Sequence, residues 1–510
     1  MDFSRPGALL NKILYTHYDM NKILRTSFFV LLIAVVSPQL SKAQVQTLTL
    51  ESSIEFAKNN SPLSRAARFS LMSAKWRYKS FRADLLPSLA LSGDAPNYNK
   101  SIFSNVLDDG TVTFSSRTQS EASAAVSIDQ NIMPTGGRLS LSSGITRLGI
   151  FTGENTYLWQ STPLVVGLSQ PLFQFNSLKW RNKTEPLRYE IAQKQYVEDM
   201  EDLSFTVTQS FFNFLLAKVN VEVAEFNVTV NDSIYNISKG RFQVGSIAQN
   251  ELLQSELEFR NARASLTTAR LDYERAEESF KALLGIDDDT EIEIILPDVA
   301  PEMEIDVEQA LTLARQNNST SLQFELNDLL ADQSYDQAKK STGFSATLNA
   351  SFGLNQTSRD LDQLYEDPQN RQFFSVGFDI PIFNWGKNQA EIKSARNTQM
   401  ETANTIAYQR LQFELNVKST VREFPQLRDQ VELARVSDDI AVQRYDVAKN
   451  RYLIGSITIT DLFIAQNQKD SSRRGYISSL RDYWTGYYNL RRLTLYDFEQ
   501  DAPIIYTTDF

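Results

Sequence analysis

Cysteine is absent from this 510-residue chain, and histidine occurs only once, at His17. Without cysteine there is no disulfide, no thiolate nucleophile and no site for a lipid anchor on an N-terminal cysteine. A lone histidine also removes most imidazole general bases and the usual zinc ligands. The sequence has no glycine-rich phosphate loop ending in Lys-Ser or Lys-Thr. We therefore expect no enzymatic activity, no cofactor and no metal site.

Long hydrophobic runs and an excess of positive charge are missing as well. No stretch reaches the roughly 20 apolar residues of a membrane-spanning helix, so any membrane insertion must use β-strands. The 51 Lys and Arg are outnumbered by 62 Asp and Glu, and the formal net charge of −11 disfavours nucleic acid as a partner. With 42% hydrophobic and 22% charged residues, the composition is that of a folded protein.

The N-terminal region has the order of a secretory signal peptide. Lys22 and Arg25 precede an apolar run, Phe28 to Val36, which is followed by the small-residue pattern Ser41-Lys42-Ala43. We expect cleavage before Gln44. The single histidine lies within the leader, so the exported chain is expected to contain neither His nor Cys.

The remainder of the chain contains an internal repeat. Two blocks recur at a constant offset of 210 positions, and a third recurs at an offset of 257. The paired blocks are 167–173 with 377–383, 241–247 with 451–457, and 50–60 with 307–317. One register maintained over more than a hundred residues indicates a tandem duplication. We divide the chain into a leader (1–43), a first repeat (44–302), a second repeat (303–493) and a C-terminal tail (494–510).

Each half predicts two very long helices that turn at a Gly-Ser pair. No glycine occurs from Leu178 to Lys239 or from Lys387 to Ile454, which favours uninterrupted helices of roughly 90 to 100 Å. Pro186 and Pro425 predict kinks within them. After the first turn, apolar residues recur every seven positions, as in a coiled coil. These residues are Leu252, Phe259, Leu266, Tyr273 and Phe280.

Other segments alternate apolar and polar residues with the period of a β-strand. The alternation covers residues 344–354 and 374–382 in the second half and 164–172 in the first. Such lengths fit tilted transmembrane strands of about 9 to 11 residues. A half-buried sheet in a soluble protein would show the same alternation, so the pattern alone leaves both interpretations open.

The signal peptide, the duplication, the alternating strands and the helical hairpins together resemble the TolC family of outer-membrane factors over nearly the whole mature chain. The most specific matches are the blocks ending Pro171-Leu172-Phe173 and Pro381-Ile382-Phe383, and the two hairpin turns. The resemblance implies an α+β membrane protein: a homotrimer in which each chain gives four strands to a twelve-stranded outer-membrane β-barrel. A long α-helical coiled-coil tunnel would continue the barrel into the periplasm.

By the same resemblance, the protein is an exit duct for passive export in a tripartite efflux or type I secretion system. Its partners would be outer-membrane lipid, a periplasmic adaptor and an inner-membrane transporter. The alternative is a periplasmic coiled-coil scaffold or adaptor that never enters a membrane, although adaptors usually need only one hairpin. The sequence does not identify the cargo, which could be drugs, metals or proteins.

One long segment departs from the family pattern. Residues 94–160 form an insertion rich in Ser, Thr, Gly and Asn, in which Ala124 to Ile132 and Arg138 to Ile145 predict an additional hairpin. We interpret the insertion as an extracellular loop. The alternative is that it widens the barrel.

The resemblance also implies an adaptor-docking site at the two turns. Glycine permits the sharp reversal of the backbone there, and small neighbours offer a surface on which another hairpin can nest. The residues are Val244, Gly245, Ser246, Ile454, Gly455 and Ser456. The alternative is that they only turn the chain.

A periplasmic gate formed by Tyr452, Glu251 and Asp461 is the second implied site. In the family, a tyrosine and carboxylates at these distances from the turn glycines meet where the helices converge, and a phenol can donate to a carboxylate. Ile457 and Ile464 replace an arginine and an aspartate that are common in the family, so we expect fewer ionic links. The alternative is that Tyr452 packs on its own helix while the carboxylates are solvated residues of first helical turns.

Overall fold

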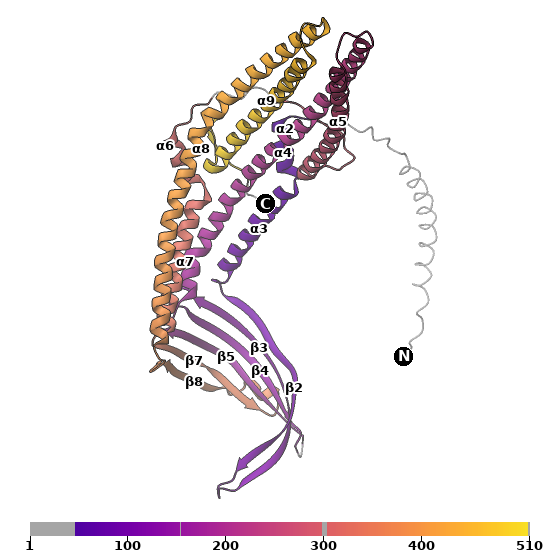
Figure 1. The fold of residues 1–510 in the computed structure, drawn as a ribbon. Helices are drawn as coiled ribbons and strands as arrows, with labels where there is room; N and C mark the ends of the chain where they lie inside the picture. The colour runs from indigo at the N-terminus through magenta and orange to yellow at the C-terminus, as the bar shows by residue number, and fades with distance from the viewer. Residues whose placement is uncertain (1–45, 153–154, 298–302, 508–510) are drawn as a thin grey trace, which may run out of the picture.

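The computed structural model describes residues 46–152, 155–297 and 303–507. The predicted signal peptide and its cleavage site before Gln44 lie outside these ranges. The molecule is elongated, with a β-sheet at one end and long helices running away from it (Figure 1).

Four long helices form two hairpins. Helices α4 (Ser177–Gln243) and α8 (Lys387–Leu453) have 67 residues each, and α5 (Gln249–Leu284) and α9 (Ile459–Thr494) have 36 each. The predicted uninterrupted helices are thus confirmed, and Pro186 and Pro425 both lie inside them. Low glycine content favours such helices, and packing of one hairpin against the other supplies most of their stability.

Four shorter helices connect the strands to the hairpins: α2 (Leu50–Asn60), α3 (Pro62–Ala83), α6 (Val307–Asn317) and α7 (Ser319–Ser341). Each begins after a polar residue whose side chain accepts a hydrogen bond from a backbone N–H of the first turn. The capping residues are Thr49, Ser61, Asp306 and Asn318. These caps satisfy donors that a helix start otherwise leaves unpaired.

The main sheet is antiparallel, with the strand order β2-β3-β4-β5-β7-β8. Its strands are β2 (Ser88–Val106), β3 (Val112–Ile132), β4 (Gly137–Ile150), β5 (Thr156–Leu172), β7 (Ser345–Ser358) and β8 (Gln369–Asp379). Strand β5 pairs with β7, which joins the two halves of the chain. The smaller elements are β1 (Gln46–Leu48) paired with β6 (Ile292–Ile294), β9 (Tyr496–Asp497) paired with β10 (Ala502–Pro503), and a 3-10 turn, Asp362–Tyr365.

The loop interpretation of residues 94–160 is wrong for most of that range. Strands β3 and β4 lie wholly within it and pair with strands on both sides, because their alternating side chains suit a two-faced sheet. Only the end of the β2–β3 hairpin, residues 100–118, extends beyond the pairing with β4 (Figure 1). The sheet consequently has six strands, where the family pattern implied four per chain.

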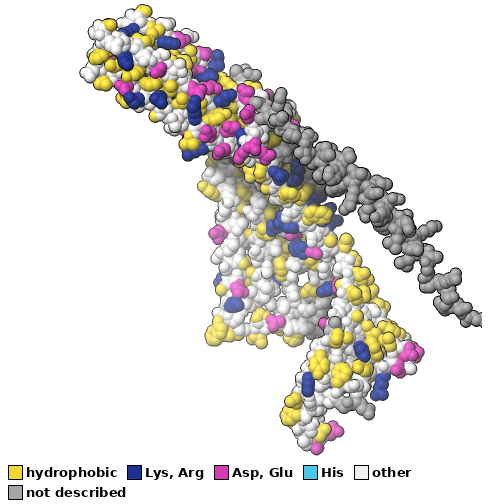
Figure 2. All heavy atoms as spheres, turned by 90° about the vertical axis from the view of Figure 1, so that its right-hand side faces the viewer, with side chains coloured by type: hydrophobic (Ala, Val, Ile, Leu, Met, Phe, Trp, Pro, Cys, Tyr) yellow, Lys and Arg dark blue, Asp and Glu magenta, His cyan; other side chains and the backbone are white. Residues whose placement is uncertain are grey.

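The sheet has one apolar face and one polar face. Leu89, Ile128, Leu141, Val166 and Phe352 oppose one another in successive strands from β2 to β7, and all five are exposed. Directly opposed residues share a face, so these side chains form a continuous apolar row. Hydrophobic side chains gather over the strands at the lower right of Figure 2.

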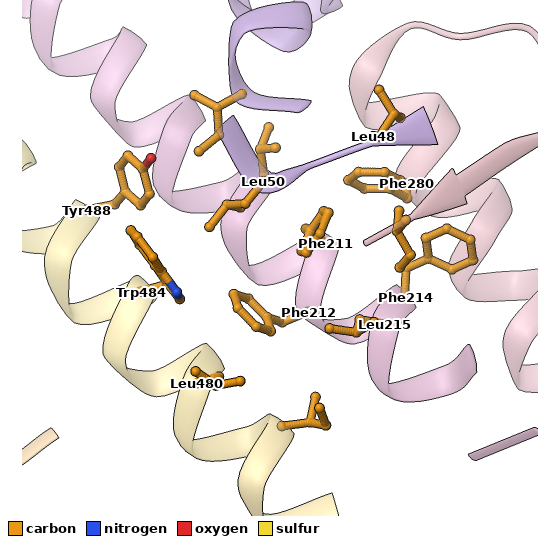
Figure 3. Close-up of a cluster of buried hydrophobic side chains, with 14 of the residues drawn as sticks. Leu48, Leu50, Phe211, Phe212, Phe214, Leu215, Phe280, Leu480, Trp484 and Tyr488 are labelled. Atoms are coloured by element: carbon orange, nitrogen blue, oxygen red, sulfur yellow. The ribbon is translucent and has the colours of Figure 1, made fainter. Parts of the chain in front are cut away.

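The largest buried cluster lies where the two hairpins meet α2 and the β1–β6 pair. It includes Phe211, Phe212 and Phe214 of α4 together with Phe280 of α5 and Trp484 of α9. Figure 3 shows Phe211, Phe212, Leu480 and Trp484 directed into the space between the helices. Burial of each aromatic side chain contributes roughly 2 to 3 kcal/mol, so this cluster fixes the mutual position of the hairpins.

Candidate functional site

The two hairpin turns have the same backbone geometry. Gly245 and Gly455 have φ angles of 74° and 76°, a conformation that glycine adopts without steric cost. The N–H of Ser246 donates to the carbonyl of Arg241 at 2.8 Å, and the N–H of Ser456 donates to that of Arg451 at 2.8 Å. These bonds close both helices with the same C-terminal motif.

The six predicted tip residues form two exposed points at the far end of the helices. Val244 and Ile454 are 77% and 78% exposed, which is unusual for aliphatic side chains, and both serines are exposed as well. The role of these residues in turning the chain is therefore visible in the structure. Docking of another protein on them stays a prediction.

Tyr452, the predicted gate tyrosine, is only 4% exposed and packs between the hairpins near their turns. Its neighbours in that cluster include Ile234 of α4 and Phe463 of α9. Its hydroxyl lies 3.1 Å from the hydroxyl of Ser238 on α4, with which it forms a hydrogen bond. Within one chain, therefore, Tyr452 joins the second hairpin to the first through a hydroxyl instead of a carboxylate.

Arg241 completes this contact, although no sequence motif pointed to a role for it. Its guanidinium lies 5.1 Å from the centre of the Tyr452 ring and donates to the carbonyl oxygens of Tyr452 and Leu453, at 3.3 and 2.9 Å. A cation at the C-terminus of α8 is also favoured by the helix dipole. The only sequence feature that could have indicated a role for Arg241 is its position at the start of a repeated block, where it is matched to Arg451.

The two predicted gate carboxylates lie in first helical turns. Asp461 accepts hydrogen bonds from the hydroxyl and the backbone N–H of Thr458, at 2.7 and 3.1 Å. These bonds lower the pKa of Asp461 below its ordinary value. Glu251 is half-buried in the first turn of α5. In the single chain Asp461 is thus a capping residue of α9, as the alternative interpretation stated, and a meeting of the carboxylates with Tyr452 stays a prediction.

Further polar contacts link the first hairpin to the second along their length. The side-chain amide of Asn227 on α4 donates to Asp470 on α9 at 2.6 Å, and Gln466 donates to Asn227 at 2.8 Å. Nearer the turns, Gln254 on α5 donates to Thr460 on α9 at 3.3 Å. Gln466 is buried, so breaking its link to Asn227 leaves its amide N–H without that partner, at a cost of about 1 to 3 kcal/mol.

A buried charge network holds the C-terminal tail against the helices. Glu201 on α4 is fully buried and accepts hydrogen bonds from Lys58 at 3.2 Å, from Arg491 at 2.9 Å and from the Tyr506 hydroxyl. Burial alone would raise the pKa of Glu201, but the charges of Lys58 and Arg491 and the hydrogen bonds together lower it. The network is structural and lies far along α4 from the hairpin turn.

The part of the chain that the structure describes was also compared with the requirements of a metal site, a membrane-spanning helix and a ligand-sized cleft. There, no three His, Cys, Asp or Glu side chains gather in a way that would hold a metal ion. None of the helices in the described ranges combines the length and apolar character needed to cross a membrane. A cleft of about 390 Å³ lies between α3, α4 and α7, with Arg77, Arg188 and Asp199 in its wall.

Comparisons with known proteins agree with this architecture. Residues 138–286 and 310–494, more than half of the chain, match the family described as outer membrane efflux protein. The outer membrane protein TolC of Escherichia coli K12 is 22% identical over 359 residues, which cover 67% of this chain and 72% of TolC.

Solved structures of outer-membrane proteins share the fold. The Campylobacter jejuni outer membrane channel CmeC gives a TM-score of 0.64 at 16% identity, covering 90% of this chain and 87% of that chain. The Vibrio cholerae outer membrane protein VceC gives a TM-score of 0.62 at 14% identity, covering 89% and 97%. The resemblance seen in the sequence is therefore confirmed, and the scaffold alternative loses its support. The chain belongs to the outer membrane efflux protein family, as a TolC-type transport protein of the outer membrane and not an enzyme.

Proposed function

We propose that three copies of this chain assemble into one continuous duct, which crosses the outer membrane through the sheets and the periplasm through the helices. Solutes pass through it passively, and a tripartite efflux or type I secretion system supplies the energy. The relatives described as outer membrane channels support this function. The observation that carries the assembly is an apolar seam on α8 that has no partner in a single chain.

The seam consists of Leu433, Ile440 and Val447, which recur every seven residues on α8. They are 68%, 59% and 58% exposed, although apolar residues at this spacing normally pack against another helix. On the other hairpin, Leu253 and Leu257 of α5 are more than half exposed too. The helices α8 and α5 lie on opposite sides of the helical region (Figure 1), so α8 of one copy can pack on α5 of the next and close a ring.

The sheet supports the same assembly. Strands β2 and β8 are its two edges, and an edge carries backbone N–H and C=O groups without partners. Within a lipid bilayer such groups must be paired, and pairing β2 of one copy with β8 of the next leaves no free edge. The apolar row of the sheet then faces lipid and the polar face lines the duct.

We further propose that the chain arose by tandem duplication, with repeats at 44–302 and 303–493 and a tail at 494–510. Helices α4 and α8 begin and end at positions offset by 210, and so do α5 and α9. Helices α2 and α6 begin and end at positions offset by 257. The offsets are those of the repeated sequence blocks, which supports a common origin of the two halves.

At the periplasmic end, the turns centred on Gly245 and Gly455 dock a periplasmic adaptor, which links the duct to an inner-membrane transporter. The duct closes there through Tyr452, with Glu251 and Asp461 of the converging hairpins near the axis. The exposed tips and the buried position of Tyr452 between hairpins support this assignment.

The test combines three measurements on the full chain expressed in a strain that lacks its own channel. We expect the protein in the outer-membrane fraction, with an N-terminus near Gln44, migrating as a trimer that dissociates on heating. We also expect it to restore resistance to at least one class of exported solute when its cognate adaptor and transporter are present. Recovery of the protein only in the soluble periplasm would instead favour a scaffold.

A further inference from the structure

The hairpin formed by β3 and β4 is amphipathic in register with the rest of the sheet. On one face, Ile128 and Leu141 continue the apolar row that Leu89 of β2 begins and Val166 of β5 extends. On the other face, Asp129 and Ser140 oppose each other, followed by Gly167. A hairpin lying outside the membrane or inside a lumen would have no physical reason to keep both faces aligned with its neighbours.

A β-bulge in β2 preserves this alignment beyond the hairpin. The register of β2 on β3 shifts between Asp94 and Asn97, so two residues of β2 oppose one residue of β3. After the shift, Ile102 opposes Ser116 and Val106 opposes Val112, which lie on the same face of β3 as Ile128. The extra residue therefore keeps Ile102 and Val106 on the same face of β2 as Leu89, whereas Phe103 opposes Ser115 on the other face.

We propose that β3 and β4 are part of the channel wall, so that the assembled barrel has 18 strands in place of the 12 implied by the family pattern. This inference rests on the three-copy assembly proposed above. Barrel diameter grows roughly linearly with strand number, so the bore is about one and a half times as wide as that of a 12-stranded barrel. Barrels of 16 to 18 strands leave an open aqueous channel.

The added wall is polar and nearly neutral on the side that faces the lumen. Ser123 and Ser127 of β3 share that face with Ser140 and Ser142 of β4. The charged pair Asp129 and Arg138, joined at 3.0 Å, neutralises itself. A wide, hydroxyl-rich lumen fits bulky hydrated solutes without strong selection by charge.

The absence of cysteine makes the wall testable by disulfide formation in the outer membrane. Ala90, Ser127, Ser142 and Val165 form one row across β2, β3, β4 and β5. The variants A90C/S127C and S142C/V165C place cysteines on directly opposed residues, within disulfide range. The variant A90C/V165C separates them by three strand spacings, or about 14 Å, which is too far. We expect efficient oxidation in the first two variants and none in the third.

The opposite result would overturn the 18-stranded wall. If A90C/V165C formed the disulfide efficiently while A90C/S127C and S142C/V165C did not, β2 would lie beside β5. Trimer migration on the same gels tests the assembly separately, because these disulfides form within one chain. A second variant replaces residues 100–155 with an Asn-Gly turn, which the register permits because Asn99 and Thr156 lie in one row of the sheet and β2 and β5 run antiparallel. Its barrel should be about one third narrower in electron micrographs; an unchanged diameter would also overturn the proposal.

Discussion

At the scale of a single residue, Glu201 is a buried carboxylate that pairs with two cations, Lys58 and Arg491. The carboxylate is fully buried, and the Lys58 and Arg491 side chains that contact it are 19% and 14% exposed. Arg491 also pairs with Asp497, so the two acids and two bases balance. A network of this kind contributes little compared with an apolar core of the same shape, but removing one member leaves its partners charged and buried.

Replacing Glu201 by Gln should lower the stability of the folded chain by about 3 to 5 kcal/mol, because Lys58 loses its counter-charge and Arg491 keeps only Asp497. The measurement is thermal unfolding in detergent, followed by circular dichroism. Asp202→Asn is the matched control, since Asp202 pairs with Arg492 at the surface and should cost under about 1 kcal/mol. Equal effects of the two substitutions would contradict the role assigned to the network.

The same variant predicts a pH dependence. The folded state lowers the pKa of Glu201 from its ordinary 4.5, so the stabilisation is complete above that pH and is lost as the pH falls toward the lowered value. The difference in melting temperature between wild type and Glu201→Gln should therefore be constant near neutral pH and shrink below about pH 4.5. A difference that does not change down to pH 3 would argue against an ionised Glu201.

At the gate, Tyr452→Phe combined with Glu251→Ala should raise single-channel conductance in planar bilayers, because the hydroxyl that holds the hairpins together and an acidic group at their ends are both removed. Arg241→Ala should act in the same direction, since Arg241 contacts the ring and two carbonyl groups of α8. Lys239→Ala, which removes an exposed cation two residues before Arg241 on the same helix, is the control. Wild-type conductance in the double variant would dismiss the gate.

At the scale of elements, the two hairpins end in turns of the same backbone geometry. Both turns are closed by glycine with positive φ, and a Cβ atom added at either glycine would meet no other atom within 4 Å. The turns therefore have open space around them in the single chain. Their conformation depends on the backbone of the local helix end and not on packing.

Arginine in place of both Ser246 and Ser456 should abolish export while trimers still form, because the bulky charges block docking without disturbing the helices. Export assays and trimer migration on gels are the two measurements. Ser233→Arg, at an exposed position on α4 away from the turn, is the control and should export normally. Normal export by the double variant would mean that the turns only reverse the chain.

At the scale of the whole molecule, the exposed seam on α8 decides whether the chain works alone. Ile440→Glu should prevent the trimer, because a charge in the seam would be buried against the neighbouring copy without a partner. The share of heat-dissociable trimer on gels measures the effect, with a loss of most of it expected. Asp439→Ala, next to the seam, removes a charge that pairs with Arg435 on the same helix and should leave the trimer unchanged. A stable Ile440→Glu trimer would place the subunit contact elsewhere.

Features that depend on neighbours along the chain were predictable from the sequence. The absence of glycine over long segments and the glycines at the turns placed both hairpins, since helix propensity and positive φ are local properties. The alternation in residues 124–132 and 138–145 likewise predicted a hairpin. Its turn is closed by Gly136 at a φ of 74°, again a local requirement.

Contacts between distant segments were decided only by the tertiary structure. The hairpin of β3 and β4 was predicted, but its place in the sheet depends on backbone bonds to β2 and β5, which a strand pattern does not specify. The partner of Tyr452 is Ser238, more than 200 positions away, and Arg241 acquires its role only there. Glu201 appeared as one more acid on a helix, because burial of a charge is a property of the folded surroundings. Local backbone preferences follow from the residue types themselves, whereas the long-range partner of each residue depends on the packing of the whole chain.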